Sequence, residues 1–223
     1  LPPTLPPAIA TTGALLLALL LALLAPLALA DQTLRVVTWN VESIGAQGSA
    51  EYNAALDVLK RIGADVVAVQ EIASTTDADH LLSLASDLQY NYATVAPGGP
   101  FGSDRAAFMS DLPLLADTSW TAAQLSGDAA ANDLTRYILE AEVDVTGQGD
   151  FMNLVVNHWK SGGANADEYR RAIETQRMAQ VVARMAADTP FVLMGDVNAD
   201  VRDGAPTPLV FTANRPLTYP RVL

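Results

Sequence analysis

The stretch VVAVQEI at residues 66–72 begins with an apolar, β-branched run that leads to Gln70 and Glu71. A run of this kind is typical of a strand that is buried on both faces of its sheet. Three other segments share the form: LRVVTWN at 34–40, FMNLVVNH at 151–158 and FVLMGDVN at 191–198. In each, polar residues follow the apolar run, at the point where a sheet core meets solvent. If these strand ends lie on one edge of the sheet, their polar side chains converge on a single cleft.

The intervening segments have helical and hairpin patterns. Helices are expected over residues 51–61, closed by Gly63, from a cap at Asp77 to about Leu88, and over residues 167–187. Further strands are expected over residues 90–95, 105–109, 137–145 and 151–156, with a hairpin signal at residues 146–150 between the last two. This alternation predicts a mixed-sheet α/β or α+β sandwich.

The polar residues at the strand ends are Asn40, Glu71, His158, Asp196 and Asn198. Carboxylate and amide oxygens are hard ligands, suited to Mg²⁺ or Ca²⁺ rather than to zinc. Histidine can donate to a phosphate oxygen or exchange a proton near neutral pH. Asp196 and Asn198 are two positions apart, so in an extended segment both side chains would point the same way.

Each of these residues alone is compatible with a turn, a cap or a solvated strand end. The segment 195–198 (GDVN) consists largely of turn formers, with Gly195 allowing close backbone approach. Their occurrence in order, each at the end of a strong strand, favours a functional site. His80 lies inside a predicted helix and is expected to be structural.

The first thirty residues differ from the rest because they contain no charged side chain. Residues 13–30 form the apolar run GALLLALLLALLAPLALA, which ends on small residues. This predicts a secretory signal peptide over residues 1–30, cleaved after Ala30, and a secreted or periplasmic protein. The alternative is a membrane anchor, since an apolar run of this length could just span a bilayer. Neither an initiator Met nor a basic residue precedes the run, so we expect the chain to be truncated at its N-terminus.

The composition limits the chemistry of the remaining residues, 31–223, whose length suits one domain. The chain has 25 acidic and 13 basic residues, a net charge of −12, and no cysteine. A thiol nucleophile, a disulfide and a cysteine-ligated metal are therefore excluded. The acidity argues against binding nucleic acid through a broad basic surface.

Five segments resemble the blocks of the endonuclease/exonuclease/phosphatase family, which has the deoxyribonuclease I-like fold. They are TWNVES (38–43), VVAVQEI (66–72), SDRAAFM (103–109), VVNHWKSGG (155–163) and VLMGDVNAD (192–200). The leader and the NHWKS form are most similar to extracellular bacterial nucleases of this family. The resemblance implies a four-layer sandwich of two mixed β-sheets flanked by helices, which hydrolyses phosphate esters with a divalent metal.

Carried over residue by residue, the resemblance implies a role for each strand-end residue. Glu71 would ligate Mg²⁺ (or Mn²⁺ or Ca²⁺), and Asn40 would help to hold the metal or the scissile phosphate. His158 would bind a phosphate oxygen, Asp196 would orient or deprotonate the attacking water, and Asn198 would hold the phosphate. The physics agrees, because a cation and donors placed at the developing charge lower the barrier to attack on an anionic diester.

Basic residues near the blocks could bind further phosphates. Arg105 and Lys160 are the candidates, with solvated surface cations as the alternative. A local cluster of Lys160, Arg170 and Arg171 would offset the overall negative charge. We expect weak, salt-sensitive and metal-dependent binding of nucleic acid.

One departure from the family pattern concerns its final Ser-Asp-His block, since no histidine follows Asn198. Either the sequence stops before that block, beyond the tail 207–223, or the protein has lost it. In both cases we expect the chain as given to be a poor catalyst.

The sequence therefore predicts a secreted, monomeric nuclease that cleaves DNA or RNA, without stable membrane association after signal cleavage. The alternatives are a phosphatase or phospholipase-C-like enzyme acting on inositol phosphates or sphingomyelin, and a non-catalytic binding protein of the same fold. The sequence does not choose between DNA and RNA, between endo- and exonucleolytic attack, or among the divalent metals.

Overall fold

The computed structural model describes residues 33–102 and 104–199. The predicted signal peptide with its cleavage site, Ser103 and the tail 207–223 lie outside the described residues. All the elements described below belong to one compact unit that starts at Leu34.

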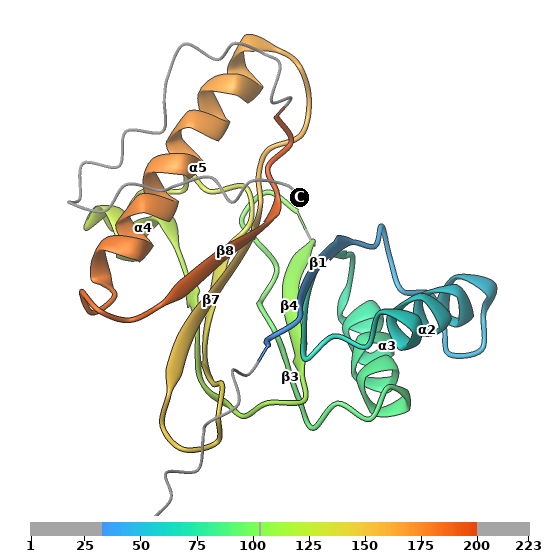
Figure 1. The fold of residues 1–223 in the computed structure, drawn as a ribbon. Coiled ribbons are helices and arrows are strands. Elements are labelled where there is room, and N and C mark those ends of the chain that lie inside the picture. The colour runs from blue at the N-terminus through green and yellow to red at the C-terminus, as the bar shows by residue number, and fades with distance from the viewer. Residues whose placement is uncertain (1–32, 103, 200–223) are drawn as a thin grey trace, which may run out of the picture. The chain divides into compact units, whose positions relative to one another are not determined.

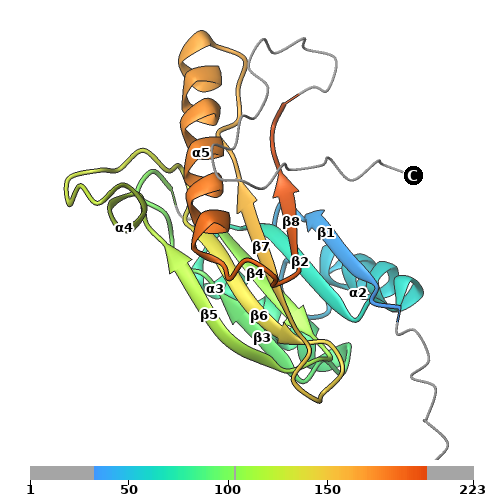
Figure 2. The same ribbon diagram turned by 60° about the vertical axis from the view of Figure 1, so that its left-hand side comes forward.

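Two four-stranded sheets form the centre of this unit (Figures 1 and 2). The first sheet has the order β1-β2-β4-β3 and consists of β1 (Val36–Asn40), β2 (Val66–Ile72), β4 (Arg105–Ser110) and β3 (Tyr92–Val95). The second has the order β5-β6-β7-β8 and consists of β5 (Leu114–Trp120), β6 (Ile138–Asp144), β7 (Phe151–His158) and β8 (Phe191–Asp196).

Both sheets are mixed, and each ends in a parallel pair. β1 pairs with β2 and β7 with β8 in parallel, whereas the other described neighbours are antiparallel. The arrowheads of β1, β7 and β8 point toward the same end of the sandwich in Figure 2. The carboxyl ends of the strands from both sheets therefore meet there.

Helices cover the outer faces of the sheets (Figure 1). α2 (Ala50–Ile62) and α3 (Thr75–Asp87) lie on the first sheet, and α4 (Ala122–Ser126) and α5 (Asn165–Arg184) lie on the second. Three apolar clusters fill the spaces between the resulting four layers. This arrangement confirms the predicted four-layer sandwich of two mixed sheets flanked by helices.

Strand β2 shows how the sequence produces the layers. Val67 and Val69 pack against α2 and α3, whereas Val66 and Ala68 pack between the two sheets. Successive side chains of a strand point to opposite faces, so an uninterrupted apolar run fills two layers at once. The predicted apolar strand is thus confirmed, with both its faces buried.

Some local expectations were wrong. The cap of α3 is Ser74, whose hydroxyl accepts from the Asp77 N–H, whereas Asp77 itself lies in the first turn. α5 covers residues 165–184 rather than 167–187. β5 and α4 were not expected, because β5 carries the polar sequence Asp117–Ser119 and α4 has only five residues. None of the helices in residues 33–102 and 104–199 is long and apolar enough to cross a membrane.

Candidate active site

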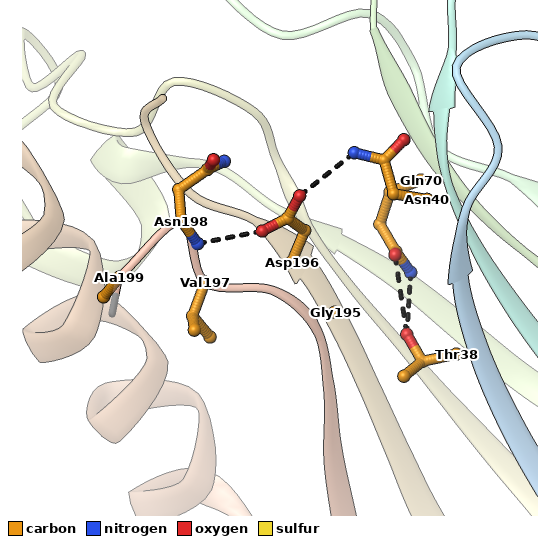
Figure 3. A pocket seen from close by; sticks show the side chains of 8 residues that line it. All are labelled: Thr38, Asn40, Gln70, Gly195, Asp196, Val197, Asn198 and Ala199. Carbon is orange, nitrogen blue, oxygen red and sulfur yellow. Dashed lines mark hydrogen bonds between the residues drawn. The ribbon is translucent and has the colours of Figure 1, made fainter. Parts of the chain in front are cut away.

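The ends of β1 and β2 meet the end of β8 at the edge between the two sheets. The amide nitrogen of Asn40, Nδ2, donates to Oε1 of Glu71 at 2.9 Å and to Oδ2 of Asp196 at 3.0 Å. Figure 3 shows the second of these bonds. One neutral side chain therefore joins two carboxylates that come from different sheets.

Glu71 reaches this position through an irregular backbone. The register between β2 and β4 shifts between Val69 and Ile72, and Glu71 has a φ of 65°. A non-glycine residue in the left-handed region is uncommon, and a β-bulge commonly re-aims a side chain beside a functional site. The bulge thus accounts for how a carboxylate at the end of a buried strand comes to face Asn40.

His158 ends β7 opposite Asp196 in the parallel register. Its side chain is buried, and its Nε2 lies 3.6 Å from Oε1 of Glu71 and 3.9 Å from Oδ2 of Asp196. Burial, assisted by the nearby positive charge of Arg136, lowers the pKa of His158 despite the two carboxylates. The imidazole is therefore neutral at pH 7, and its Nε2 faces the two carboxylates.

Asp196 is held as an anion. Burial alone would raise its pKa, but the hydrogen bonds from the side chain of Asn40 and the N–H of Asn198 outweigh it, with help from His158 and Arg136. The net effect lowers the pKa of Asp196. A carboxylate that is ionised at neutral pH can accept a hydrogen bond or a proton from water.

The segment after β8 is not extended as expected, yet the side chains of Asp196 and Asn198 still line one cavity. The Asn198 N–H donates to Oδ1 of Asp196 at 2.9 Å, and Asn198 has a φ of 48°. Its side-chain Nδ2 donates to the carbonyl of Trp159 at 3.0 Å. Asx-type bonding within a short Asp-containing segment explains this conformation.

Gly195 allows the close approach that the sequence suggested. It has a φ of 133°, and a Cβ at this position would overlap the carbonyl oxygen of Asn157. A glycine is therefore required for β8 to pair here with β7. The pairing places the Asp196 backbone opposite His158.

Asn40, Asp196 and Asn198 open onto a cavity of about 550 Å³. Its lining comes from the ends of both sheets, and Figure 3 shows it: Thr38, Asn40, Gln70, Gly195, Asp196, Val197, Asn198 and Ala199. Thr38 and Gln70, which the sequence did not single out, hydrogen-bond to each other in the cavity wall. The cavity is wide enough for a phosphate ester with part of its leaving group.

The two candidate phosphate cations lie elsewhere. Arg105 begins β4 opposite Ile72 and is partly buried. Lys160 lies 3.1 Å from Asp167 and lines a second, smaller cavity together with Arg170. Arg171 donates to the carbonyl of Lys160 at 2.9 Å, so the structure does bring the predicted basic cluster together.

Arg136 belongs to the site but was missed. Its Nη1 donates to the carbonyl of Trp159 at 3.3 Å, and its Nη2 pairs with Asp104 at 2.7 Å. The residues singled out from the sequence lie at the ends of strands, whereas Arg136 precedes the start of β6. Because β6 is antiparallel to β7, the start of β6 lies beside the end of β7. The antiparallel pairing, visible in the hairpin signal, could have located it.

The donor set around Asn40 fits a hard divalent cation. Glu71 provides a partly exposed carboxylate, Asp196 a second one close by, and Asn40 an amide oxygen, which in this structure accepts from the Glu42 N–H at 3.2 Å. Mg²⁺ commonly uses only one or two protein carboxylates and keeps water or substrate oxygens as its other ligands. Within the described ranges, no cluster of three or more histidine and acidic side chains forms a complete metal cage.

The family follows from a comparison over most of the chain. Residues 37–219 match the Endonuclease/Exonuclease/phosphatase family. The chain belongs to this family. Its members are phosphoric ester hydrolases, and the match includes the four strand-end blocks described above. The extracellular bacterial subgroup stays a prediction, and so do the individual catalytic roles.

Solved structures with this fold agree with the assignment. TDP2 from D. rerio, complexed with a single-strand DNA product, has a TM-score of 0.58 at 18% identity, over 76% of this chain and 62% of that one. An endonuclease/exonuclease/phosphatase from Beutenbergia cavernae gives 0.56 at 21%, over 79% and 50%. Sphingomyelinase C from Streptomyces griseocarneus gives 0.57 at 18%, over 78% and 67%. At these identities the likeness shows the fold alone. No curated protein sequence matches the chain.

Proposed function

We propose that this protein is a divalent-metal-dependent phosphodiesterase that hydrolyses DNA or RNA. The observation that carries the proposal is the meeting of Asn40, Glu71, His158 and Asp196 at one edge, from strands of both sheets. A carboxylate can accept the proton of an attacking water, and an imidazole or amide can donate to the charge that develops on a phosphate diester. Family membership supports the same reaction class.

Each residue has a role that its contacts allow. Asp196, ionised and fixed by two hydrogen bonds, orients the attacking water and accepts its proton. His158 donates its N–H to a non-bridging phosphate oxygen, where negative charge develops. The backbone N–H of Asn198 donates to Asp196 and so orients that carboxylate toward the cavity.

The metal would be Mg²⁺, with Mn²⁺ or Ca²⁺ as the other candidates, held by Glu71 and the amide oxygen of Asn40. When bound, such a cation neutralises the phosphate and polarises its P–O bonds. The Nδ2 atom of Asn40 donates one hydrogen to Glu71 and the other to Asp196, and so holds both carboxylates in place. We assign Glu71 to the cation and Asp196 to the attacking water.

Nucleic acid is the proposed substrate class for two reasons. A structural neighbour, D. rerio TDP2, is complexed with single-strand DNA product, and a second cavity beside the site is lined by three cationic side chains. Because the chain as a whole carries a charge of −12, binding should depend on the metal and weaken with added salt.

The assay that tests the function uses the full-length gene product with plasmid DNA, RNA, sphingomyelin and inositol phosphates. Each substrate is incubated with Mg²⁺ and, separately, with EDTA. Cleavage of either nucleic acid with Mg²⁺ but not with EDTA supports the proposal. Preferential hydrolysis of sphingomyelin or inositol phosphates favours the alternative of a phospholipase-C-like enzyme or a phosphatase. A protein that hydrolyses none of these esters favours the binding-protein alternative.

We further propose that the protein is exported as a monomer and is free of membrane after cleavage at Ala30. The support is the charge-free sequence of residues 1–30 with its small-residue exit. Fractionation of a bacterial host followed by N-terminal sequencing tests this. A mature chain that starts at Asp31 outside the inner membrane supports export, whereas an uncleaved, membrane-bound chain supports the anchor alternative.

A further inference from the structure

A second cavity of about 250 Å³ is lined by one aromatic side chain and three cationic ones: Phe101, Thr135, Arg136, Lys160, Ser161 and Arg170. We propose that this cavity, the Phe101 pocket, binds an unstacked nucleobase and its adjoining phosphate, next to the phosphate that is cleaved. The protein would then prefer single-stranded nucleic acid. The inference rests on the proposed phosphodiesterase function and names the part of the substrate beyond the reacting group.

The Phe101 pocket adjoins the active site through one backbone carbonyl. The carbonyl oxygen of Trp159 accepts from Nδ2 of Asn198 at 3.0 Å and from Nη1 of Arg136 at 3.3 Å. Asn198 lines the larger cavity and Arg136 the smaller one. A chain with its scissile phosphate at Asp196 therefore has its neighbouring nucleotide at the Phe101 pocket.

The aromatic wall suits a base. The Phe101 side chain is 53% exposed, and the guanidinium of Arg170 lies over its ring at 4.9 Å from the centroid. Aromatic rings and arginine planes together form stacking platforms for bases in single-strand-binding proteins. A base inside a duplex has no free face for such stacking, so the platform selects an unpaired one.

The charges suit the adjoining phosphate. Arg136 pairs with Asp104 and Lys160 with Asp167, whereas Arg170 has the Phe101 ring and the carbonyl of Asn132 as its neighbours. Arg171 donates to the carbonyl of Lys160, and Glu174 adds a third carboxylate to Asp104 and Asp167. Four cations against three carboxylates give this region a formal charge of +1, in a chain whose net charge is −12. The region is thus locally attractive to an anion.

The walls of the pocket are held in place. A Cβ at Gly99 would come within 2.6 Å of the Thr135 carbonyl, so glycine lets the loop before Phe101 pack closely. The buried carboxylate of Glu174 accepts from the N–H of Thr135 at 2.8 Å and of Lys160 at 2.7 Å. Binding to walls that are already ordered loses less entropy.

The same charges disfavour the lipid alternative. A phosphocholine headgroup ends in a quaternary ammonium, which Arg136, Lys160 and Arg170 would repel. An aromatic ring can bind such a cation, but the Arg170 guanidinium stacked with the Phe101 ring would repel the cation at that position, whereas an uncharged base can stack on the pair. The pocket therefore fits a base with its phosphate better than a choline headgroup.

The test measures binding and hydrolysis separately. Fluorescence anisotropy in Mg²⁺, with Asp196→Asn added to every protein to slow cleavage, gives the affinity for short labelled oligothymidylate and oligouridylate. Hydrolysis of bis(p-nitrophenyl) phosphate in Mg²⁺ by the same proteins without that added change reports the reaction without a second nucleotide. The variants are Phe101→Ala and Arg170→Gln. The control is Phe151→Ala, an exposed aromatic at the opposite end of β7. Thermal unfolding by circular dichroism verifies that each variant is folded.

We expect Phe101→Ala and Arg170→Gln to weaken oligonucleotide binding roughly 5- to 100-fold, with hydrolysis of the small diester and the control variant unchanged. Wild-type affinity for oligonucleotides in both variants overturns the proposal. It is also overturned if Phe101→Ala weakens binding to sphingomyelin vesicles but not to oligonucleotides. If both variants bind oligonucleotides more weakly than wild type but wild type hydrolyses no diester, the proposed function is contradicted and the pocket assignment is supported.

Discussion

Asn40 donates its side-chain amide to Asp196 at 3.0 Å across 156 positions of sequence and from one sheet to the other. The same nitrogen donates to Glu71 at 2.9 Å. The bond thus fixes the active site and the relative position of β1 and β8, the strands at which the two sheets meet.

Replacing Asn40 by aspartate puts a third carboxylate between Glu71 and Asp196 and removes both hydrogen bonds. In EDTA we expect Asn40→Asp to lower the free energy of unfolding by about 1–3 kcal/mol. Mg²⁺ should raise the melting temperature of the variant more than that of wild type, because the cation offsets the repulsion. Asn165→Asp, an exposed residue of α5, is the control with the same charge change. Equal Mg²⁺ responses in all three proteins would argue against a cation site here.

Gly195→Ala tests the close approach of β8 to β7. The new Cβ would overlap the carbonyl of Asn157, at a φ of 133°. We expect the free energy of unfolding to fall by about 2–4 kcal/mol, measured by urea denaturation. Gly147→Ala, also at a positive φ but with nothing within 4 Å, separates the steric effect from the backbone effect. Equal losses in the two variants would mean that the contact with Asn157 is unimportant.

Glu174→Gln tests the buried carboxylate that holds two backbone segments. A glutamine offers one acceptor oxygen, so either the Thr135 or the Lys160 N–H loses its partner. The expected loss is about 1–3 kcal/mol in urea unfolding, accompanied by weaker oligonucleotide binding. Glu168→Gln, exposed on the same helix, should change neither quantity. Wild-type stability in Glu174→Gln would show that the two contacts carry little weight.

The pair between Arg177 and Asp133 gives a pH dependence. The hydrogen bond from Arg177 lowers the pKa of Asp133 from its ordinary 3.8, outweighing the effect of burial. The stabilisation is therefore complete above about pH 4 and is lost as the pH falls through the lower pKa of the folded state. Asp133→Asn should cost about 1–2 kcal/mol at pH 7, with the difference from wild type narrowing in acid. If the difference in free energy of unfolding between Asp133→Asn and wild type, measured in urea, does not change with pH, the pair between Arg177 and Asp133 is not its cause.

Much of the fold could be predicted because its central strands are continuous apolar runs. The run VVAVQ in β2 fills the layers on both sides of its sheet, which a surface strand could not do. β5 escaped because it pairs through its backbone while carrying Asp117, Thr118 and Ser119, and no apolar run marks it. The α3 cap was misplaced by three residues, because Ser and Asp both cap helices and only the structure shows which one does.

The site was predictable where its residues follow parallel strands. Asn40, Glu71, His158 and Asp196 do so, and the structure brings them together. Arg136 precedes an antiparallel strand, so its place beside Trp159 depends on the β6–β7 register, which a rule about strand ends does not use. The turn that joins Asp196 to Asn198 was missed because strand periodicity does not describe an Asx turn.

The most direct test of the account is the rate of phosphodiester hydrolysis by Asp196→Asn in Mg²⁺, beside wild type in Mg²⁺ and in EDTA. Asp57→Asn, an exposed carboxylate on α2, serves as the control. The account predicts that wild type and control hydrolyse the diester only with the metal, and that Asp196→Asn lowers kcat/KM roughly 100- to 10,000-fold while remaining folded. Hydrolysis by Asp196→Asn at the wild-type rate, or hydrolysis that EDTA leaves unchanged, would contradict it.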